Sequence, residues 1–386
     1  MKKIFAFGLS ICVVLLFATL PVNGADVSKG LKIGAAGPFT GAAAAPGMEI
    51  FNSIKVAVDE VNAAGGIKGV KVELVMGDDA MDAAQGVNVA EKFCSDKTMY
   101  GVIGPPMSNV AQATLRNYGG CDMTSITSAA SKNELTEKGY KQFFRVNARD
   151  DAHGPAVGRF IVENLGAKSL YTLTTKDAYS IGYIDQVTAT VKQMGVNRVW
   201  ADTIVAGAKD FSSVLTRVKA QNPDVVICGA KTAPDHTMVV RQMRELGIKA
   251  IYFGSEGSKD KKEFIQASEG AAQGAYMNHF SPDIYKIPEA QKYVKAYESK
   301  YGNLSGFGPP AYEAAKILLA GMAKAAADGD ITRKEVMKYV SQTENYRGIL
   351  GFPVTFDKKG DLMGGATFIF KVVGSDFQLV KVAKGK

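Results

Sequence analysis

The chain has 386 residues, of which 46% are hydrophobic and 22% are charged, and its formal net charge is +8. This composition is ordinary for a folded globular protein, and the length favours two domains. Lysine and arginine are scattered among acidic residues and do not form a basic face, so no nucleic-acid partner is expected.

The first 24 residues are typical of a secretory signal peptide. Lys2 and Lys3 precede an apolar run over 4–20, and small residues lead to Gly24. We expect cleavage after Gly24, so that the mature protein begins at Ala25. The alternative is an uncleaved membrane anchor, but the run is at the short limit of a bilayer span.

Removal of the signal peptide leaves three cysteines, and export permits a disulfide between two of them. Cys228 lies in an apolar, strand-like run over 224–230 and is expected to be a buried free thiol. Cys94 and Cys121 therefore form the candidate pair.

Strand-like and helical patterns alternate along the first part of the mature chain. Ile50, Ile54, Val58 and Val61 recur with a helical period, and a glycine pair at 65–66 then stops the helix. Strands are predicted at 31–37, 70–78, 100–104 and 123–127, with helices between them at 48–66, 83–96 and 109–120. This alternation predicts an α/β domain with a parallel sheet.

A second series of the same kind begins after about residue 149. Strands are predicted at 169–175, 198–205, 224–230 and 250–255, and helices at 154–166, 181–195, 210–222, 236–247, 288–302 and 310–329. The segment 352–374 is predicted to form hairpin-like strands with turns at 358–360 and 364–365. No low-complexity linker separates the two series, so we expect several crossings between two lobes.

The residue patterns of common catalytic and cofactor sites are not found. His153, His236 and His279 are widely separated, and neither a metal-ligand spacing nor a nucleophile elbow is present. The Gly- and Ala-rich segment 35–47 follows a predicted strand but fits neither nucleotide-binding fingerprint. We therefore predict no metal, no cofactor and no catalytic residue, which argues against an enzyme.

Ser108 is the first candidate binding residue, because it lies where a buried strand and a turn over 101–107 lead into a helix. Helix N-termini carry unpaired N–H groups and favour anions. Serine is also a preferred N-cap residue. The pattern alone leaves both a helix cap and a contact to a ligand carboxylate open.

Several segments together resemble the periplasmic Leu/Ile/Val-binding proteins of ABC importers. The similar stretches include the motifs "GGIKG", "FGSEG" and "FDKKGD" and cover essentially the whole mature chain, at 65–93, 127–161, 206–230, 253–257 and 356–361. The resemblance implies the type I periplasmic binding fold: two doubly wound parallel-sheet lobes, joined by three crossovers, around a cleft that closes on the ligand. The implied division is a signal peptide at 1–24, a first lobe at 25–149 plus about 278–356, and a second lobe at 150–277 plus about 357–386.

The same resemblance implies a function in transport. The protein would be a monomeric, periplasmic solute-binding component that captures an amino acid, aliphatic or branched-chain, and delivers it to an inner-membrane ABC permease. Two alternatives stay open: the same class binding another carboxylate or an amide, such as an aromatic acid, and the ligand-sensing domain of a receptor.

Five residues match the ligand-binding positions of the family. Ser108, Ala129 and Ser131 fall on positions that hold the ligand carboxylate, Tyr179 on a tyrosine that closes over the ligand, and Glu256 on the acid that pairs with its ammonium. A capping box with Glu134 is another interpretation of Ser131. Asp150 matches the segment that enters the second lobe, and we interpret it as a hinge or rim residue.

The chain departs from the family at the pocket wall. Pro46 replaces one family tyrosine, and Lys231 or Thr232 replaces another. Met81 and Met107 stand in place of the family's cysteine pair, and Phe307 is a further candidate wall residue. The side-chain pocket is therefore expected to differ from that of the family, and the ligand's side chain stays open.

Overall fold

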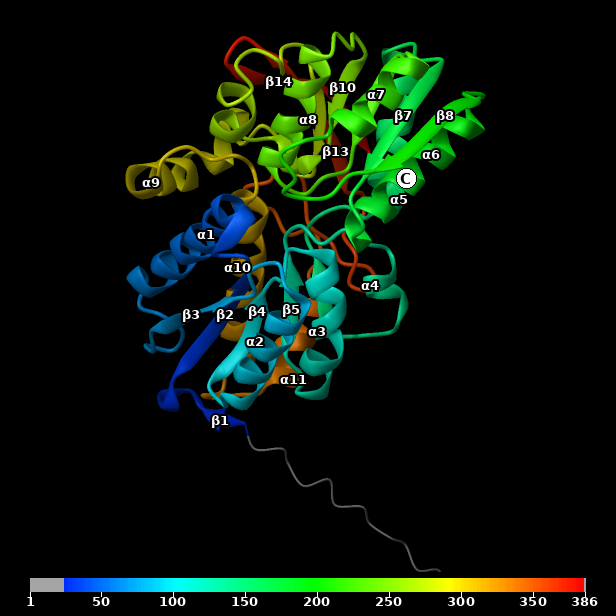
Figure 1. Cartoon of the computed structure of the whole chain (residues 1–386). Helices are drawn as coiled ribbons and strands as arrows, with labels where there is room; N and C mark the ends of the chain where they lie inside the picture. Colours follow the sequence, from blue (N-terminus) through cyan, green and yellow to red (C-terminus); the bar gives the residue numbers. More distant parts are fainter. Residues whose placement is uncertain (1–23, 385–386) are drawn as a thin grey trace, which may run out of the picture.

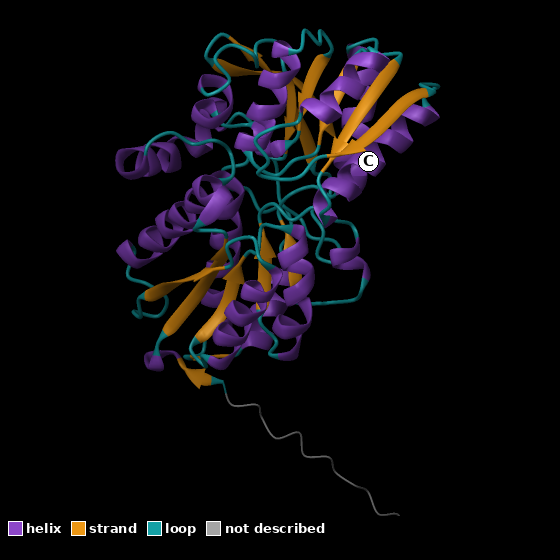
Figure 2. Cartoon of the chain, in the orientation of Figure 1, coloured by secondary structure: helices purple, strands orange, loops and turns teal. Residues whose placement is uncertain are grey.

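The computed structural model describes residues 24–384, so the predicted signal peptide lies outside the described residues, apart from Gly24. The chain forms two α/β lobes placed end to end, each with a central sheet covered by helices (Figure 1 and Figure 2). Within the described range, no helix combines the length and the apolar character needed to cross a bilayer.

The first lobe contains a five-stranded, fully parallel sheet with the order β3-β2-β4-β5-β6. Its strands are β2 (Leu31–Gly37), β3 (Val72–Asp78), β4 (Met99–Ile103), β5 (Thr124–Thr127) and β6 (Phe143–Arg145). Its helices are α1 (Ala44–Ala63), α2 (Ala83–Ser95), α3 (Ser108–Gly120), α4 (Glu134–Glu137), α9 (Gln291–Tyr301), α10 (Gly308–Ala325) and α11 (Arg333–Ser341). The late helix α10 packs on α1, β4 and β5, so this lobe is discontinuous in sequence.

The second lobe contains a seven-stranded mixed sheet with the order β14-β13-β11-β10-β9-β7-β8. Its strands are β7 (Ser169–Thr174), β8 (Arg198–Thr203), β9 (Val225–Cys228), β10 (Ile251–Gly254), β11 (Tyr276–His279), β13 (Ala366–Val373) and β14 (Asp376–Lys384). Its helices are α5 (Asp150–Arg159), α6 (Ala178–Gln193), α7 (Ser212–Gln221) and α8 (Ala233–Glu245).

Each lobe has its own apolar core. In the first lobe, Ile33, Ile54 and Leu318 belong to a core between the sheet, α1 and α10. In the second lobe, one core contains Met243 of α8 and another contains Val187 of α6. A short antiparallel pair, β1 (Ala25–Asp26) with β12 (Asp330–Ile331), ties the start of the described chain to the first lobe.

The chain passes between the lobes three times. The first crossover joins β6 to α5, the second joins β11 to α9, and the third leads from α11 to β13. The fold predicted from the family resemblance is thus confirmed, with one correction. The second sheet is not fully parallel, because β13 runs antiparallel to β11 and is joined to β14 by a hairpin with its turn at Gly374.

Periodicity located the long elements and missed the short or polar ones. The strands and helices predicted over 31–255 are present with shifted ends, but β6, β11, β14, α4 and α11 were not predicted, and the segment 352–374 contains one strand, β13, in place of the predicted hairpin-like strands. β6 has three residues and α4 has four, too few to show a period. β11 carries the buried polar residues Asn278 and His279, which interrupt an apolar pattern.

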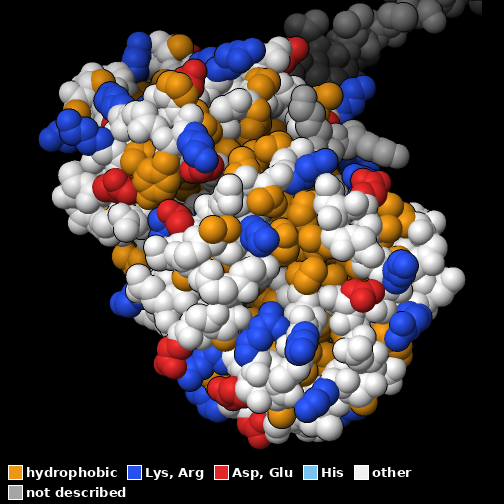
Figure 3. All heavy atoms as spheres, turned by 90° about the horizontal axis from the view of Figure 1, so that it is seen from above, with side chains coloured by type: hydrophobic (Ala, Val, Ile, Leu, Met, Phe, Trp, Pro, Cys, Tyr) orange, Lys and Arg blue, Asp and Glu red, His pale blue; other side chains and the backbone are white. Residues whose placement is uncertain are grey.

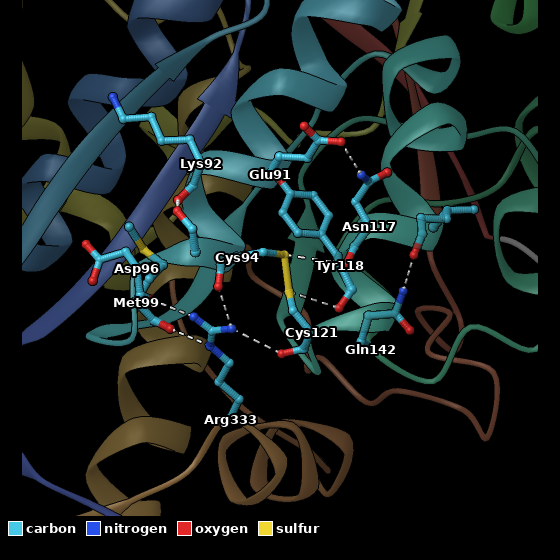
Figure 4. The surroundings of a disulfide bond; sticks show 12 residues. Glu91, Lys92, Cys94, Asp96, Met99, Asn117, Tyr118, Cys121, Gln142 and Arg333 are labelled. Carbon is cyan, nitrogen blue, oxygen red and sulfur yellow. Dashed lines mark hydrogen bonds between the residues drawn. A yellow bond between two sulfur atoms is a disulfide. The ribbon is translucent and has the colours of Figure 1, made fainter.

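The predicted disulfide is confirmed. Cys94 in the last turn of α2 and Cys121 just after α3 are bonded, with a Cα–Cα distance of 5.8 Å, and Cys228 is a buried free thiol. The guanidinium of Arg333 in α11 donates hydrogen bonds to the carbonyls of both bonded cysteines (Figure 4). The bridge and this arginine together join α2, α3 and α11 at one end of the first lobe.

Candidate functional site

A pocket lies between the lobes and is lined by residues of both. From the first lobe come Pro38, Pro46, Gly47, Ile50, Pro106, Met107, Ser108, Ala129 and Phe307, and from the second lobe and its crossover come Tyr179, Lys231, Glu256, Gly257 and Phe280. Four of the five predicted ligand-binding residues and all four predicted wall residues are therefore brought together. Ser131 is buried nearby but does not line the pocket.

The turn after β4 carries Ser108 to the pocket. Gly104 has a φ of +105°, and a Cβ atom there would lie 2.1 Å from the carbonyl oxygen of Ala36, so only glycine fits. The next strand holds the turn, because Ser125 Oγ donates to the Gly104 carbonyl at 2.7 Å and Thr127 Oγ1 to the Pro105 carbonyl at 2.8 Å. The helix start is thereby fixed against β5.

Ser108 is not a helix cap, contrary to one of its two interpretations. α3 begins at Ser108, and the N-cap position belongs to Met107, which makes no side-chain cap bond. The buried Ser108 Oγ instead accepts a hydrogen bond from the backbone N–H of Lys132 at 3.3 Å. The hydroxyl therefore links the start of α3 to the loop that follows β5.

The capping box predicted for Ser131 and Glu134 is also wrong. α4 begins at Glu134 after Asn133, no side-chain cap bond forms there, and the buried Ser131 hydroxyl has no hydrogen-bond partner among the described residues. The short α4 leaves Ser131 in the preceding loop. A buried polar group without a partner is costly, so this hydroxyl is a candidate for a contact that forms only when the pocket is filled.

Asp150 is a buried crossover residue and does not lie on a rim. It is only 2% exposed at the start of α5, and its N–H donates to the Ser131 carbonyl at 2.9 Å. Burial raises the pKa of its carboxyl to about 7. The nearby Ser131 hydroxyl partly offsets that rise in pKa, because its dipole favours the charged form of the Asp150 carboxyl. The geometry between the hydroxyl and the carboxylate is not that of a hydrogen bond.

Glu256 supplies a buried carboxylate on the other side of the pocket. It begins a single helical turn directly after β10. Asn278 Nδ2 of β11 donates to its Oε1 at 2.6 Å, and the Tyr179 hydroxyl donates to its Oε2. Asn278 is oriented in turn by the Tyr183 hydroxyl, which donates to its Oδ1 at 2.7 Å. One carboxylate is thus held by side chains from α6 and β11.

Burial controls the protonation of this group. It raises the pKa of the Glu256 carboxyl above its ordinary value, while the donors Tyr179 and Asn278 favour the charged form. The pKa of Tyr179 is raised well above 10, first by burial and then by the charge of Glu256, so its hydroxyl stays a hydrogen-bond donor. The network keeps a carboxylate in place while both of its oxygens accept hydrogen bonds.

The remaining walls are largely apolar. The rings of Phe280 and Phe307 meet edge to face, with centroids 5.7 Å apart. Lys231 is the exception, since its ammonium lies 3.6 Å from Asp177 Oδ1. Met107 lines the pocket and Met81 does not, so only one of the two substituted methionines is a wall residue.

Sequence reasoning missed several residues of this site. Phe280 and Ile50 line the pocket, and Asn278 and Tyr183 orient Glu256. Tyr183 could have been found, because it follows Tyr179 by one helical turn, and the two rings stack 5.8 Å apart. No sequence pattern pointed to Asn278, since its role comes only from its hydrogen bond to Glu256, which is distant in the chain.

These features define the class of protein. Two α/β lobes enclose a largely apolar pocket that is also lined by Ser108 at a helix start of the first lobe and by the buried carboxylate of Glu256 in the second. No group of three or more metal-ligating side chains is found in the part of the chain that the structure describes. On the face seen in Figure 3, basic side chains are spread among acidic and apolar ones. This is the architecture of a two-lobed, small-molecule-binding protein.

The chain belongs to the periplasmic binding protein family, whose profile matches residues 30–377. It is 30% identical to Leu/Ile/Val-binding protein homolog 1 of Brucella suis over 94% of each chain. It is also 31% identical to the Leu/Ile/Val-binding protein BraC3 of Rhizobium johnstonii over 94% of this chain and 96% of that one. Membership implies a periplasmic location and a family of binding proteins, not of enzymes.

Solved structures show the same fold. A leucine-binding protein of Thermotoga maritima matches with a TM-score of 0.83 at 24% identity, over 92% of this chain and 98% of that chain. A solute-binding protein of R. palustris in complex with benzoate matches with a TM-score of 0.82 at 19% identity, over 92% and 97%.

Proposed function

We propose that this chain is the solute-binding component of an ABC importer and that it captures an aliphatic, branched-chain amino acid between its lobes. One observation carries the proposal: Ser108 at the start of α3 in the first lobe lines the same pocket as the buried carboxylate of Glu256 in the second. An amino acid carries the two complementary charges. The relatives named as Leu/Ile/Val-binding proteins support the side-chain class.

The proposed contacts divide the ligand between the lobes. Ser108, Ala129 and Ser131 hold the carboxylate, and Glu256 pairs with the ammonium while Tyr179 closes over it. Apolar walls receive the side chain, with Ile50, Met107, Phe280 and Phe307 as the contacts. A ligand bound at both ends favours the closed arrangement, because it makes all of these contacts only when the lobes approach.

Calorimetric titration tests this proposal. Leucine, isoleucine and valine are compared with isovalerate, which is valine without its amino group. The affinity for valine should exceed that for isovalerate by about 30-fold or more, because the contact of the ammonium with a desolvated carboxylate is worth about 2–5 kcal/mol. Isovalerate binding as tightly as valine would overturn the amino-acid assignment. Mass spectrometry of ligand released from the purified protein gives an independent answer.

A second candidate ligand is an aromatic carboxylate. Pro46, and either Lys231 or Thr232, stand where the family resemblance places tyrosines, and Phe280 and Phe307 offer ring edges and faces. The related R. palustris structure is a complex with benzoate. Benzoate is therefore included in the titration, and tight benzoate binding with no amino-acid binding would favour this alternative.

The remaining parts of the proposal concern assembly and export. We infer a monomer that delivers its ligand to an inner-membrane permease, with lobe boundaries near residues 149, 278 and 357. N-terminal sequencing of protein from the cell envelope should find Ala25 at or within a residue or two of the start. An intact Met1 with tight membrane association would contradict the cleaved signal peptide.

A further inference from the structure

The loop over 129–132 is held from behind by the first crossover. Arg145 Nη1 donates to the carbonyls of Ala130 at 3.2 Å and Lys132 at 3.0 Å, and the Asp150 N–H donates to the Ser131 carbonyl between them. Three consecutive carbonyls thus point toward the crossover. In a trans peptide the N–H points away from the preceding carbonyl. Accordingly, the Lys132 N–H reaches Ser108 Oγ on the pocket side.

The guanidinium of Arg145 is fully buried, and a buried charge needs a partner of opposite charge. Asp361 forms an ion pair with it, at 2.6 Å between Nε and Oδ1, and Thr136 Oγ1 accepts a hydrogen bond from Nη2 at 2.8 Å. The Thr136 hydroxyl donates to Asp361 Oδ2 at 2.8 Å. A buried guanidinium without its acid is strongly destabilising, so Asp361 is what permits the arginine behind this loop.

This pairing also explains the motif "FDKKGD", which the pocket does not use. The motif ends at Asp361 in the third crossover, and the backbone N–H of Arg145 donates to the Gly360 carbonyl at 3.0 Å. The segment before β13 lies beside α4 at the junction of the lobes (Figure 1). Arg149 also pairs with Asp361, at 2.8 Å, but donates to none of the three loop carbonyls.

We propose that Arg145, held by Asp361, is a positioning residue for the carboxylate end of the pocket, an inference that rests on the proposed function. Its Nη1 fixes two carbonyls of the loop while Nη2 and Nε are held by Thr136 and Asp361, so that Ser131, whose N–H lies on the pocket side, is presented to the ligand carboxylate. Lysine keeps the charge but has a single nitrogen and cannot engage all of these partners in one plane. Arg145 acts on ligand affinity through the loop and touches no ligand atom.

Double-mutant cycles with leucine as the titrant test the proposal. Arg145→Lys alone should weaken leucine binding by about 2- to 30-fold. In the double variant with Ser131→Ala, at the same end of the pocket, the loss of leucine affinity should be smaller than the product of the losses in the two single variants. Combined with Glu256→Gln at the opposite end, the two effects should multiply, because those groups share no contacts. Arg149→Gln is the matched control: it also loses a bond to Asp361 and should show no coupling to Ser131→Ala.

If Arg145→Lys only lowered the general stability of the protein, its effect on affinity would multiply with that of Ser131→Ala just as it does with that of Glu256→Gln. Multiplicative effects in both cycles would therefore overturn the proposal. If Arg145→Lys does not fold, as judged by circular dichroism, Thr136→Val removes one acceptor of the same guanidinium. Thr136→Val should also couple to Ser131→Ala and not to Glu256→Gln, with a smaller coupling than that of Arg145→Lys. Absence of coupling between Thr136→Val and Ser131→Ala would also overturn the proposal. Wild-type protein that binds leucine while both cycles are multiplicative leaves the proposed function standing. Wild-type protein that binds no amino acid overturns both.

Discussion

The two ends of the pocket are built in different ways. The first-lobe end is formed by Ser108 and Ala129, which follow two adjacent parallel strands, β4 and β5, and carries no buried charge. The second-lobe end uses one carboxylate, Glu256, oriented by side chains of α6 and β11. Under the proposed function, the binding energy at the first end is expected to be spread over several weak donors, while at the second it is expected to depend on one charge.

The largest effect is expected at the single charge. Glu256→Ala should weaken binding of leucine by about 2–5 kcal/mol, which is about 30-fold or more, because the ligand ammonium loses its partner in a desolvated site. Isothermal titration measures it. Glu245→Ala is the matched control, since Glu245 is an exposed carboxylate at the end of α8 and should leave the affinity unchanged. Equal affinities for wild type and Glu256→Ala would remove the contrast between the two ends.

The first lobe should depend on its disulfide. Replacing Cys94 and Cys121 by serine should lower the free energy of unfolding by about 3–4 kcal/mol, because the bridge closes a loop with a sequence separation of 27 residues. Urea unfolding measures the loss. Thiol titration of the denatured, unreduced mature protein should find one free thiol, that of Cys228. Three free thiols would show that the bridge is not formed in the protein.

The pH dependence of binding separates the two ends further. Burial raises the pKa of Glu256, and only the ionised carboxylate attracts an ammonium. Affinity should therefore fall as the pH decreases through that pKa, by up to about tenfold per pH unit. Titrations from pH 8 to pH 4 test this, and Glu256→Gln should flatten the curve. Because the pKa of Asp150 is about 7, the series is repeated with Asp150→Asn, in which the fall at low pH should persist.

The smallest effect is expected at Ser108. Ser108→Ala removes one hydroxyl but leaves the backbone N–H groups of α3, so binding should weaken by about 0.5–1.5 kcal/mol, or about two- to tenfold. Ser95→Ala removes an exposed hydroxyl in the same lobe and serves as the control. A loss as large as that of Glu256→Ala would show that the carboxylate end also depends on one side chain.

The comparison also shows what could be predicted from the sequence. Ser108 and Ala129 lie directly after predicted strands of one sheet, and the carboxyl ends of neighbouring parallel strands meet at one edge. The resemblance placed Tyr179, Glu256 and the wall residues, and the structure gathers them around one pocket. Their contacts with a ligand stay predictions.

The sequence by itself determined the elements that depend on local order: most of the long strands and helices, the α/β class and the candidate cysteine pair. Periodicity of 3.6 or 2 residues records which face of an element is buried, and this signal needs no knowledge of distant partners. It failed where an element was short or carried buried polar groups, as in β6 and β11.

Only the tertiary structure decided which polar groups have partners. Ser108 and Ser131 both fit local capping patterns, yet the hydroxyl of Ser108 accepts from a neighbouring loop and that of Ser131 has no partner within residues 24–384. Arg145 and Asp361 are separated by most of the second lobe in sequence and pair only because two crossovers meet. The physical reason is that a buried polar group must find its partner in space, and spatial proximity between distant segments leaves no periodic trace in the chain.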